Sequence, residues 1–271
     1  MSCSSCHILS SAFTDGKTVS HGRMGHSGKR NAPTLANIAW MPRLMMEGGV
    51  PSLEAQALAP LHDSLEMGFN MMVYVDELNE DENLRAMAKA AYGRDSIDPF
   101  VVTRALSAFQ RTFISGDSRY DRFKSGYKNE MSDMEMAGMS LFFSEKTKCS
   151  ECHNEPFFTD FGYYNIGLEA DYTDTGKERA THDSSDIGKF KTPTLRNIEL
   201  TGPYMHDGRM STLEEVVSFI NRGEKLHANQ DERIVPLHLT DEEQAQIVAF
   251  LKTLTDWNFV QNANLLAPVD R

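Results

Sequence analysis

The sequence predicts an all-α protein built from two related domains, residues 1–130 and 131–271. Apolar residues recur at helical spacing behind recognisable helix caps, which is typical of amphipathic helices. The stretches 8–60 and 154–210 are rich in Gly, Pro, Ser, Thr and Asp, which indicates loops and turns rather than a sheet. A segment of the first half also recurs in the second, which places the domain boundary near residue 130.

The first strong helix signal is Asp98-Pro99, because Asp suits the N-cap and Pro suits the first helical turn. Apolar residues follow at helical spacing, so we expect this helix to reach about residue 113. The residues on its apolar face are Val102, Leu106 and Phe109. A second helix should begin at Ser132, span residues 134–143 and lead into a cysteine motif.

Two capping boxes mark the helices near the end of the chain. Ser211 is followed three residues later by Glu214, and Gly223 suits the C-terminal end of the helix that they open. Thr240 and Glu243 form the second box, whose helix should run to about residue 254. We therefore expect both helices to belong to the second domain.

An internal repeat is the most informative feature of the sequence. Each half holds a Cys-x-x-Cys-His motif followed by Phe-Thr-Asp, at residues 13–15 and 158–160. Residues 33–38 (Pro-Thr-Leu-Ala-Asn-Ile) match residues 193–198, and a Leu-Glu pair follows each Pro by twenty residues. From residue 33 to about 60 the copies align without a gap at an offset of 160, which indicates a duplicated unit.

Composition narrows the class of protein. The formal net charge of -12 argues against nucleic-acid binding, which needs a basic face. No apolar run approaches the length of a membrane span, and no secretory signal is visible. The first motif stands two residues from the start of the printed sequence, so we expect an upstream segment to be missing from it.

The two cysteine motifs are the chemical centre of the sequence. Two thiols three positions apart can each form a thioether to a haem vinyl group, and the adjacent His can ligate the iron. The alternative is one four-cysteine zinc site, but each pair carries a following His and lies in a matching repeat. We therefore predict two haem c groups and a periplasmic location, because haem is attached outside the cytoplasm in bacteria. The motif residues are Cys3, Cys6 and His7, and Cys149, Cys152 and His153.

A protein that only carries electrons needs little beyond its haems, but this chain also has polar residues that could act on a substrate. Gln56, Pro60 and Glu66 follow the first motif. A carboxylate held over an open haem face can take the first proton of peroxide and return it to the leaving oxygen. The alternative for Glu66 is an ordinary solvated residue.

Four segments resemble the bacterial di-haem cytochrome c peroxidases and their relatives of the MauG type, and the resemblance covers nearly the whole chain. The segments are residues 30–35 (Arg-Asn-Ala-Pro-Thr-Leu), 53–68, 190–197 (Phe-Lys-Thr-Pro-Thr-Leu-Arg-Asn) and 200–209 (Leu-Thr-Gly-Pro-Tyr-Met-His-Asp-Gly-Arg). The resemblance implies an all-α fold of two cytochrome c-like haem domains. It also implies peroxide as substrate and a small electron-donor protein, a cytochrome c or a cupredoxin, as partner.

The resemblance also implies roles for individual residues. Gln56, Pro60 and Glu66 match the distal pocket of the first haem, with Glu66 as the acid–base group. Three further residues match the ligands of a calcium ion between the domains, which suits a hard cation because the ligands are oxygens. These are Asn31, Thr201 and Pro203. Family members often dimerise, so a homodimer is one expected assembly.

The sequence departs from the family at three positions. The distal His of the first haem falls on Arg23, and a guanidinium has no lone pair for iron, so we expect that iron to be open unless His26 reaches it. The Trp between the haems falls on Met46. The distal ligand of the second haem falls on Ile220, which cannot ligate iron. His206 occupies the place of Met46 in the repeat, either bonding a haem propionate or as a structural His.

These observations predict an enzyme that reduces hydrogen peroxide to water. His7 would hold the peroxidatic haem and His153 the haem that accepts electrons. Two alternatives stay open. A MauG-type enzyme would oxidise residues of a partner protein, which Arg23 favours and Ile220 disfavours. A non-enzymatic electron-transfer cytochrome is compatible with the change at Met46.

Overall fold

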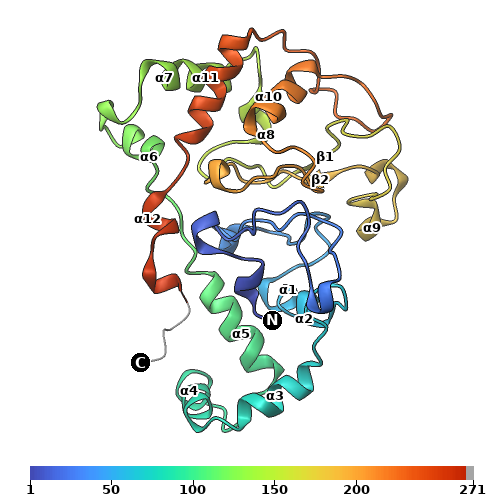
Figure 1. Cartoon of the computed structure of the whole chain (residues 1–271), viewed down its shortest axis with the longest axis vertical. Helices are drawn as coiled ribbons and strands as arrows, with labels where there is room; N and C mark the ends of the chain where they lie inside the picture. Colours follow the sequence, from blue (N-terminus) through green and yellow to red (C-terminus); the bar gives the residue numbers. More distant parts are fainter. Residues whose placement is uncertain (267–271) are drawn as a thin grey trace.

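The computed structural model describes residues 1–266, which form a mostly helical protein with two halves, one above the other in Figure 1. The helices drawn in the lower half are α1 (Leu53–Gln56), α2 (Leu58–His62), α3 (Met71–Asn79), α4 (Glu82–Tyr92) and α5 (Pro99–Gln110). Those in the upper half are α6 (Arg119–Lys124), α7 (Asp133–Phe142), α8 (Cys149–Cys152), α9 (Glu178–Thr181), α10 (Leu213–Arg222) and α11 (Asp241–Lys252). Helix α12 (Trp257–Val260) leads the chain back down beside the lower half.

Extended structure is scarce. Strands β1 (Tyr163–Tyr164) and β2 (Phe190–Lys191) pair antiparallel, with Tyr163 opposite Lys191. Short 3-10 turns connect the helices. They are Cys3–Ser5, Leu9–Ser11, Arg23–Gly25, Ile38–Trp40, Lys128–Glu130, Ser184–Asp186, Ile198–Leu200 and Ala263–Leu265. Among the described residues, no helix is long and apolar enough to cross a membrane.

The helix predictions are confirmed to within a few residues at their ends. Helix α5 begins at Pro99 behind the Asp98 cap, and α7 begins after Ser132, whose side chain forms a capping box with Glu135. Helix α11 has the Thr240–Glu243 box, and α10 ends at Gly223 in the left-handed conformation. One detail is wrong: the cap of α10 is Thr212, paired with Glu215, rather than Ser211 with Glu214.

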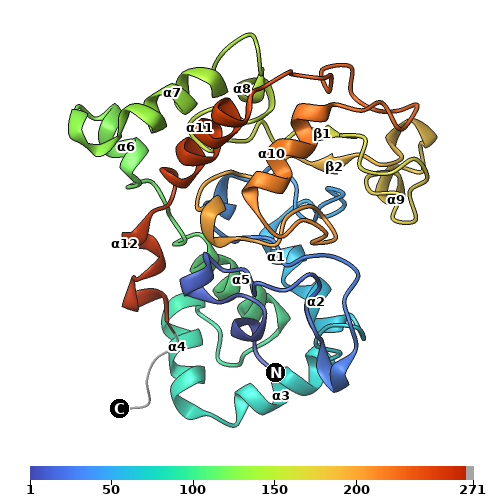
Figure 2. The same cartoon turned by 45° about the horizontal axis from the view of Figure 1, so that its top comes forward.

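Two of the buried hydrophobic clusters include segments from the opposite half of the chain. The second core lies between α7, α10 and α11, and it includes Tyr120 from α6. The core around the first cysteine motif includes Phe259, Val260 and Leu265 from α12 and the turn that follows it. A cut at residue 130 would therefore leave Tyr120 on one side and its packing partners on the other. Figure 2 shows α12 descending beside the lower half.

Helices α7 and α11 cross closely within the second core. A Cβ atom placed on Gly138 would lie 1.8 Å from the backbone oxygen of Gln246, so a larger residue cannot fit without moving one helix. Phe142 and Phe250 pack beside this crossing, with ring centroids 5.1 Å apart. Gly138 thus sets how near the two helix axes can approach.

The same hydrogen-bond pattern occurs in both halves. The side-chain oxygen of Asn37 accepts from the backbone N–H of Ser115 at 3.0 Å, and that of Asn197 accepts from the N–H of Asp256 at 2.8 Å. Asn37 and Asn197 are both left-handed and buried. Ser115 in turn donates to the Asp256 carboxylate at 3.2 Å, so the two patterns meet at one buried point.

The offset between matching elements changes along the chain. It is 160 residues between Leu53 and Leu213, at the starts of α1 and α10, and 142 between Pro99 and Asp241, at the starts of α5 and α11. Between these two points the first half has more residues than the second, and the additional length includes helices α3 and α4. They form a helical pair at the lower end of Figure 1.

Candidate haem sites

The first cysteine motif folds as a tight turn that orients His7. The His7 backbone N–H donates to the Cys3 carbonyl at 2.9 Å, and ring atom Nδ1 lies 2.7 Å from the Phe13 carbonyl. A carbonyl only accepts, so Nδ1 carries the proton and Nε2 keeps its lone pair. Burial lowers the pKa of His7, although the Phe13 carbonyl and Asp15 oppose this. The neutral ring can therefore offer Nε2 to a metal.

The second motif repeats this geometry. Helix α8 holds both thiols, and the His153 backbone N–H donates to the Cys149 carbonyl at 2.9 Å. Ring atom Nδ1 of His153 lies 3.0 Å from the Phe158 carbonyl. Burial also lowers the pKa of His153, against the opposing effect of that carbonyl. Each half thus presents one neutral imidazole held by one backbone carbonyl.

Phe13 and Phe158 are functional residues whose role the sequence did not reveal. Both are buried and have positive φ, 63° and 53°, a conformation that is strained for an aromatic residue. This conformation aims their carbonyl groups at the His rings. The repeated Phe-Thr-Asp was the available signal, because each Phe stands at the same place behind its motif.

The four cysteines fit covalent haem attachment. All four are free thiols, and each pair lies on one turn of helix with its His alongside. Desolvation raises the pKa of Cys6 and raises that of Cys152 to about 11, so the thiols are protonated at neutral pH. The donor set, two thiols and one oriented imidazole per half, is the set that haem c requires.

Gln56, Pro60 and Glu66 come close together in the chain around α1 and α2. Gln56 ends α1, Pro60 lies within α2, and Glu66 stands in the turn after α2. Burial raises the pKa of Glu66, and the charge of Asp63 raises it further. The Glu66 carboxylate is near enough to the first motif to raise the pKa of Cys6. This half-buried carboxyl is therefore close to the first haem-attachment site.

Arg23 lies against the same turn. Its backbone N–H donates to the Glu66 carbonyl at 2.6 Å, and its guanidinium carbon is 5.6 Å from the centre of the Phe69 ring. A Cβ atom on Gly22 would lie 1.9 Å from the Leu65 carbonyl oxygen, so this loop packs directly on the turn. The His26 side chain is exposed.

The other predicted site residues lie where the halves meet. The Asn31 backbone N–H donates to the His206 carbonyl at 2.8 Å, which brings Asn31 to the loop that carries Thr201 and Pro203. The Met46 carbonyl accepts from the Lys191 backbone N–H at 2.9 Å, so residue 46 does lie between the halves. Burial lowers the pKa of the Lys191 side chain to about 8.

An ion pair and a cation–π contact of Arg30 cross this interface. Arg30 pairs with Asp174 through two hydrogen bonds of 2.6 and 2.9 Å, and it also pairs with Glu47. Its guanidinium carbon lies 5.6 Å from the centre of the Phe190 ring. Phe190 stacks on His206 with centroids 3.9 Å apart.

The face of the second site is apolar at the expected ligand position. Ile220 is half-buried and lies on α10, three residues after Val217, which is buried in the second core. An aliphatic side chain offers no donor atom to iron. The position therefore supplies no ligand to the second haem.

Comparison with known proteins identifies the family. The profile of a family described as "Di-haem cytochrome c peroxidase" matches residues 1–129. The chain is 31% identical to methylamine utilization protein MauG of Methylophilus methylotrophus, covering 94% of this chain and 76% of that protein. It is 33% identical to cytochrome c551 peroxidase of Nitrosomonas europaea, covering 94% of this chain and 74% of the relative.

A solved structure agrees with these matches over almost the whole chain. It is a MauG-like protein described as associated with microbial copper homeostasis, with a TM-score of 0.93 and 35% identity. The match covers 99% of this chain and 87% of that one. The paired motifs, the oriented imidazoles and these matches agree: the chain belongs to the di-haem cytochrome c peroxidase and MauG family.

Proposed function

We propose that the protein reduces hydrogen peroxide to water, with electrons from a small periplasmic donor protein such as a cytochrome c or a cupredoxin. The reaction consumes one peroxide, two electrons and two protons, and it yields two waters. The observation that carries this proposal is Glu66, a half-buried carboxyl with a raised pKa beside the first haem-attachment motif. An electron carrier has no use for such a group.

The residues divide the work between two haem c groups. Cys3, Cys6 and His7 would hold the peroxidatic haem, whose iron supplies the redox chemistry of O–O cleavage when bound. Cys149, Cys152 and His153 would hold the haem that accepts electrons.

In the pocket, Glu66 takes the proton from one peroxide oxygen and returns it to the other, which leaves as water. Gln56 holds the peroxide or a water by hydrogen bonds, and Pro60 limits the space. The raised pKa of Glu66 suits this work, because a group that both takes and gives a proton acts best when its pKa is near the working pH.

Replacing Glu66 by Gln tests this function. Glu66→Gln keeps the size of the side chain but cannot carry the proton, so peroxide turnover should fall by roughly 10²-fold or more with haem content unchanged. The measurement is steady-state oxidation of a reduced cytochrome c by peroxide. Glu77→Gln, an exposed position on α3, is the matched control and should keep full turnover. Unchanged turnover in haem-loaded Glu66→Gln would refute the role.

A second candidate is a MauG-type enzyme that oxidises side chains of a partner protein. Arg23 favours it, because Arg stands where a peroxidase of this family has its distal His. The similarity to the MauG-like structure points the same way. Ile220 disfavours it. Rapid reaction with peroxide but no turnover with any reduced donor would favour this candidate, and no reaction with peroxide would leave an electron carrier.

Further proposals concern the architecture. We propose that the two haem units, 1–130 and 131–271, arose by internal duplication, supported by the matched hydrogen bonds of Asn37 and Asn197. Each unit depends on the other for its core, because Tyr120 packs in the second core and residues of α12 pack in the first. A homodimer stays an expectation from the family.

Calcium between the units is a proposal too. The hydrogen bond from Asn31 to the His206 carbonyl brings this residue near the loop of Thr201 and Pro203. The Asn31 side-chain N–H₂ donates to the Lys17 carbonyl at 2.7 Å, which leaves its oxygen available to a cation. A hard cation would find one side-chain amide oxygen and two backbone carbonyls there.

A further inference from the structure

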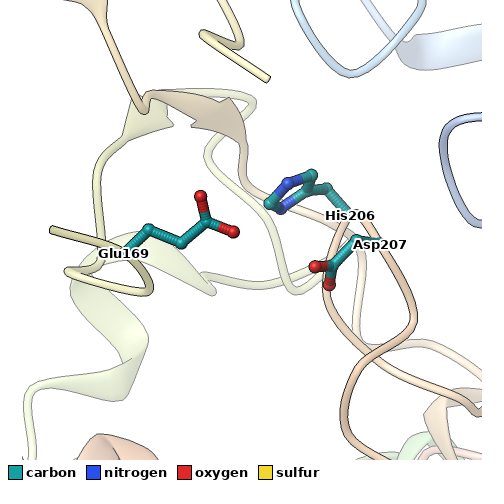
Figure 3. Close-up of side chains that lie close together, drawn as sticks. All are labelled: Glu169, His206 and Asp207. Atoms are coloured by element: carbon teal, nitrogen blue, oxygen red, sulfur yellow. The ribbon is translucent and has the colours of Figure 1, made fainter. Parts of the chain in front are cut away.

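We propose that Glu169, His206 and Asp207 form a binding site for a divalent first-row transition-metal ion. Figure 3 shows the three side chains, with Glu169 on one side and the other two on the facing loop. Their nearest ligand atoms all lie within 4.8 Å of one another. None of the three is a proposed ligand of haem iron or of calcium, and the proposal gives His206 a role other than the propionate bond or the structural role considered for it from the sequence. It therefore stands apart from the peroxidase function.

His206 is the residue that points to a ligand. The residue is 9% exposed, and its ring nitrogens have no hydrogen bond to the described residues. Stacking on Phe190 fixes the plane of the ring and uses only its face. The nitrogens lie at the edge of the ring and remain available. An imidazole nitrogen without a protein partner can ligate an ion through its lone pair.

The donor set selects the class of ion. One imidazole nitrogen and two carboxylate oxygens suit Zn²⁺, Mn²⁺ or Cu²⁺, whereas Ca²⁺ and Mg²⁺ prefer oxygen alone. Three donors bound to one ion at about 2.1 Å each lie about 3.4 Å apart in tetrahedral geometry. The ligand atoms, which all lie within 4.8 Å of one another, therefore need to close by at most about 1.4 Å, which side-chain rotation can supply.

Arg209 holds the two carboxylates in the absence of metal. It donates to Asp207 through Nε at 2.6 Å, and it also pairs with Glu169. The Arg209 side chain is 36% exposed, so it can swing into solvent when an ion takes its place. Metal and guanidinium compete for the same two charges. Removing Arg209 should therefore strengthen metal binding, which a purely structural ion pair would not predict.

The internal repeat gives an independent comparison. Met46 and Glu47 occupy, at the offset of 160, the places of His206 and Asp207. Glu47 pairs with Arg30 across the interface, and Met46 supplies no imidazole. The first half therefore has the same turn without the donor set, and only one metal ion of this kind is expected per chain.

Equilibrium dialysis of the haem-loaded protein against Zn²⁺ tests the proposal, with bound metal measured by mass spectrometry. Haem on the cysteines keeps Zn²⁺ from those thiols. We expect one zinc that His206→Gln weakens by roughly tenfold or more. Glu169→Gln should also weaken it, and it serves as the second variant if His206→Gln does not fold. Arg209→Gln should tighten it roughly fivefold.

Two controls separate this site from others. His182→Gln changes an exposed His outside the cluster and should leave zinc binding unchanged. Asn31→Ala changes a proposed calcium ligand and should also leave it unchanged. Equal zinc binding in wild type, His206→Gln and Glu169→Gln, or weaker binding in Arg209→Gln, would overturn the proposal. Peroxide turnover is not the readout, so failure here is distinct from failure of the peroxidase proposal.

Discussion

Glu66 carries a charge in a place that disfavours it, and this has a consequence for stability. Its pKa is raised above the ordinary 4.5 by burial and by Asp63. A carboxyl with a raised pKa in the folded state contributes its stability at low pH and loses it as the pH rises through the folded pKa. The wild-type protein should therefore lose stability relative to a neutral variant as the pH rises above 4.5.

The prediction is that Glu66→Gln is more stable than wild type at pH 7 and that the difference disappears at pH 4. Urea unfolding of the haem-loaded proteins at both pH values measures it. Glu77→Gln should show no pH-dependent difference. The same stability gap at pH 4 and pH 7 would contradict a raised pKa at Glu66.

Arg23 leads to a spectroscopic prediction. Its guanidinium has no lone pair for iron, so the first haem should be open in the oxidised protein and show a high-spin signal by electron paramagnetic resonance. Arg23→His restores an imidazole at this place and should convert that signal to low-spin. Arg23→Gln is the control and should stay high-spin. A low-spin first haem in wild type that is lost in His26→Gly would show instead that His26 closes the site.

The sequence identified the residues that bind haem, but it did not identify the backbone carbonyl groups that orient the two His rings. Cys-x-x-Cys-His is local, so its members are recognisable without a fold. The carbonyl groups of Phe13 and Phe158 depend on positive φ values, which no pattern of side chains announces. Glu169 was missed for a different reason: it reaches His206 and Asp207 only through tertiary structure, 37 positions before the nearer of the two.

The crossing of α7 and α11 gives a prediction about helix packing. Alanine favours helices over glycine, so propensity alone would make Gly138→Ala stabilising. The added Cβ would lie 1.8 Å from a backbone oxygen of α11, however, and must push the helices apart. We expect a loss of about 3 kcal/mol in the free energy of unfolding, at the upper end of overpacking effects.

A matched substitution isolates the steric cause. A Cβ on Gly116 meets nothing within 4 Å, and its φ is not in the left-handed region. Gly116→Ala should therefore leave stability unchanged or slightly raised. Thermal unfolding of both variants measures the difference, and a stable Gly138→Ala would mean that the helices do not cross here as described.

Elements with local signals were predicted well, and those without were not. Helices α5, α7 and α11 have caps and apolar spacing in one continuous segment. The cap of α10 was placed one residue early, because Ser211 and Thr212 each precede a Glu by three positions. Strands β1 and β2 are two residues each and 26 positions apart at their nearest ends, so their pairing depends on the folded loop between them.

Asp256 links the segment after α5 to the start of α12. Its carboxylate accepts hydrogen bonds from Ser115, from the backbone N–H groups of Gly116 and Asp117 at 2.9 and 3.0 Å, and from the N–H of Phe259 at 2.9 Å. Asp256→Ala removes all four and leaves buried donors unpaired, so we expect a loss on the order of 3 kcal/mol. Urea unfolding measures it.

Unfolding of the wild type tests how the halves depend on each other. Because Asp256 joins a segment after α5 to the start of α12, unfolding should still follow one transition in the wild type, seen alike by both haems. Asp241→Ala, at the exposed start of α11, is the control and should cost much less. Separate transitions for the two haems in wild type would contradict the coupling.

The repeat in the sequence indicated two related units but not how they share their cores. Matching residues align from 33 to about 60, and the later correspondence of α5 with α11 is hidden because α3 and α4 change the offset. The places of Tyr120 and Phe259 in the opposite cores have no counterpart in any local pattern. Only the folded chain shows that exchange.

The placement of Phe259, Val260 and Leu265 sets the order in which the fold can be completed. The neighbours of the Cys3–His7 motif meet these residues only when the two ends of the described chain come together, because almost the whole described chain lies between them. The second core can close earlier, because its members end at Leu254. The first motif should therefore stay accessible to the haem-attachment machinery until the last helix arrives and covers Leu9 and Phe13.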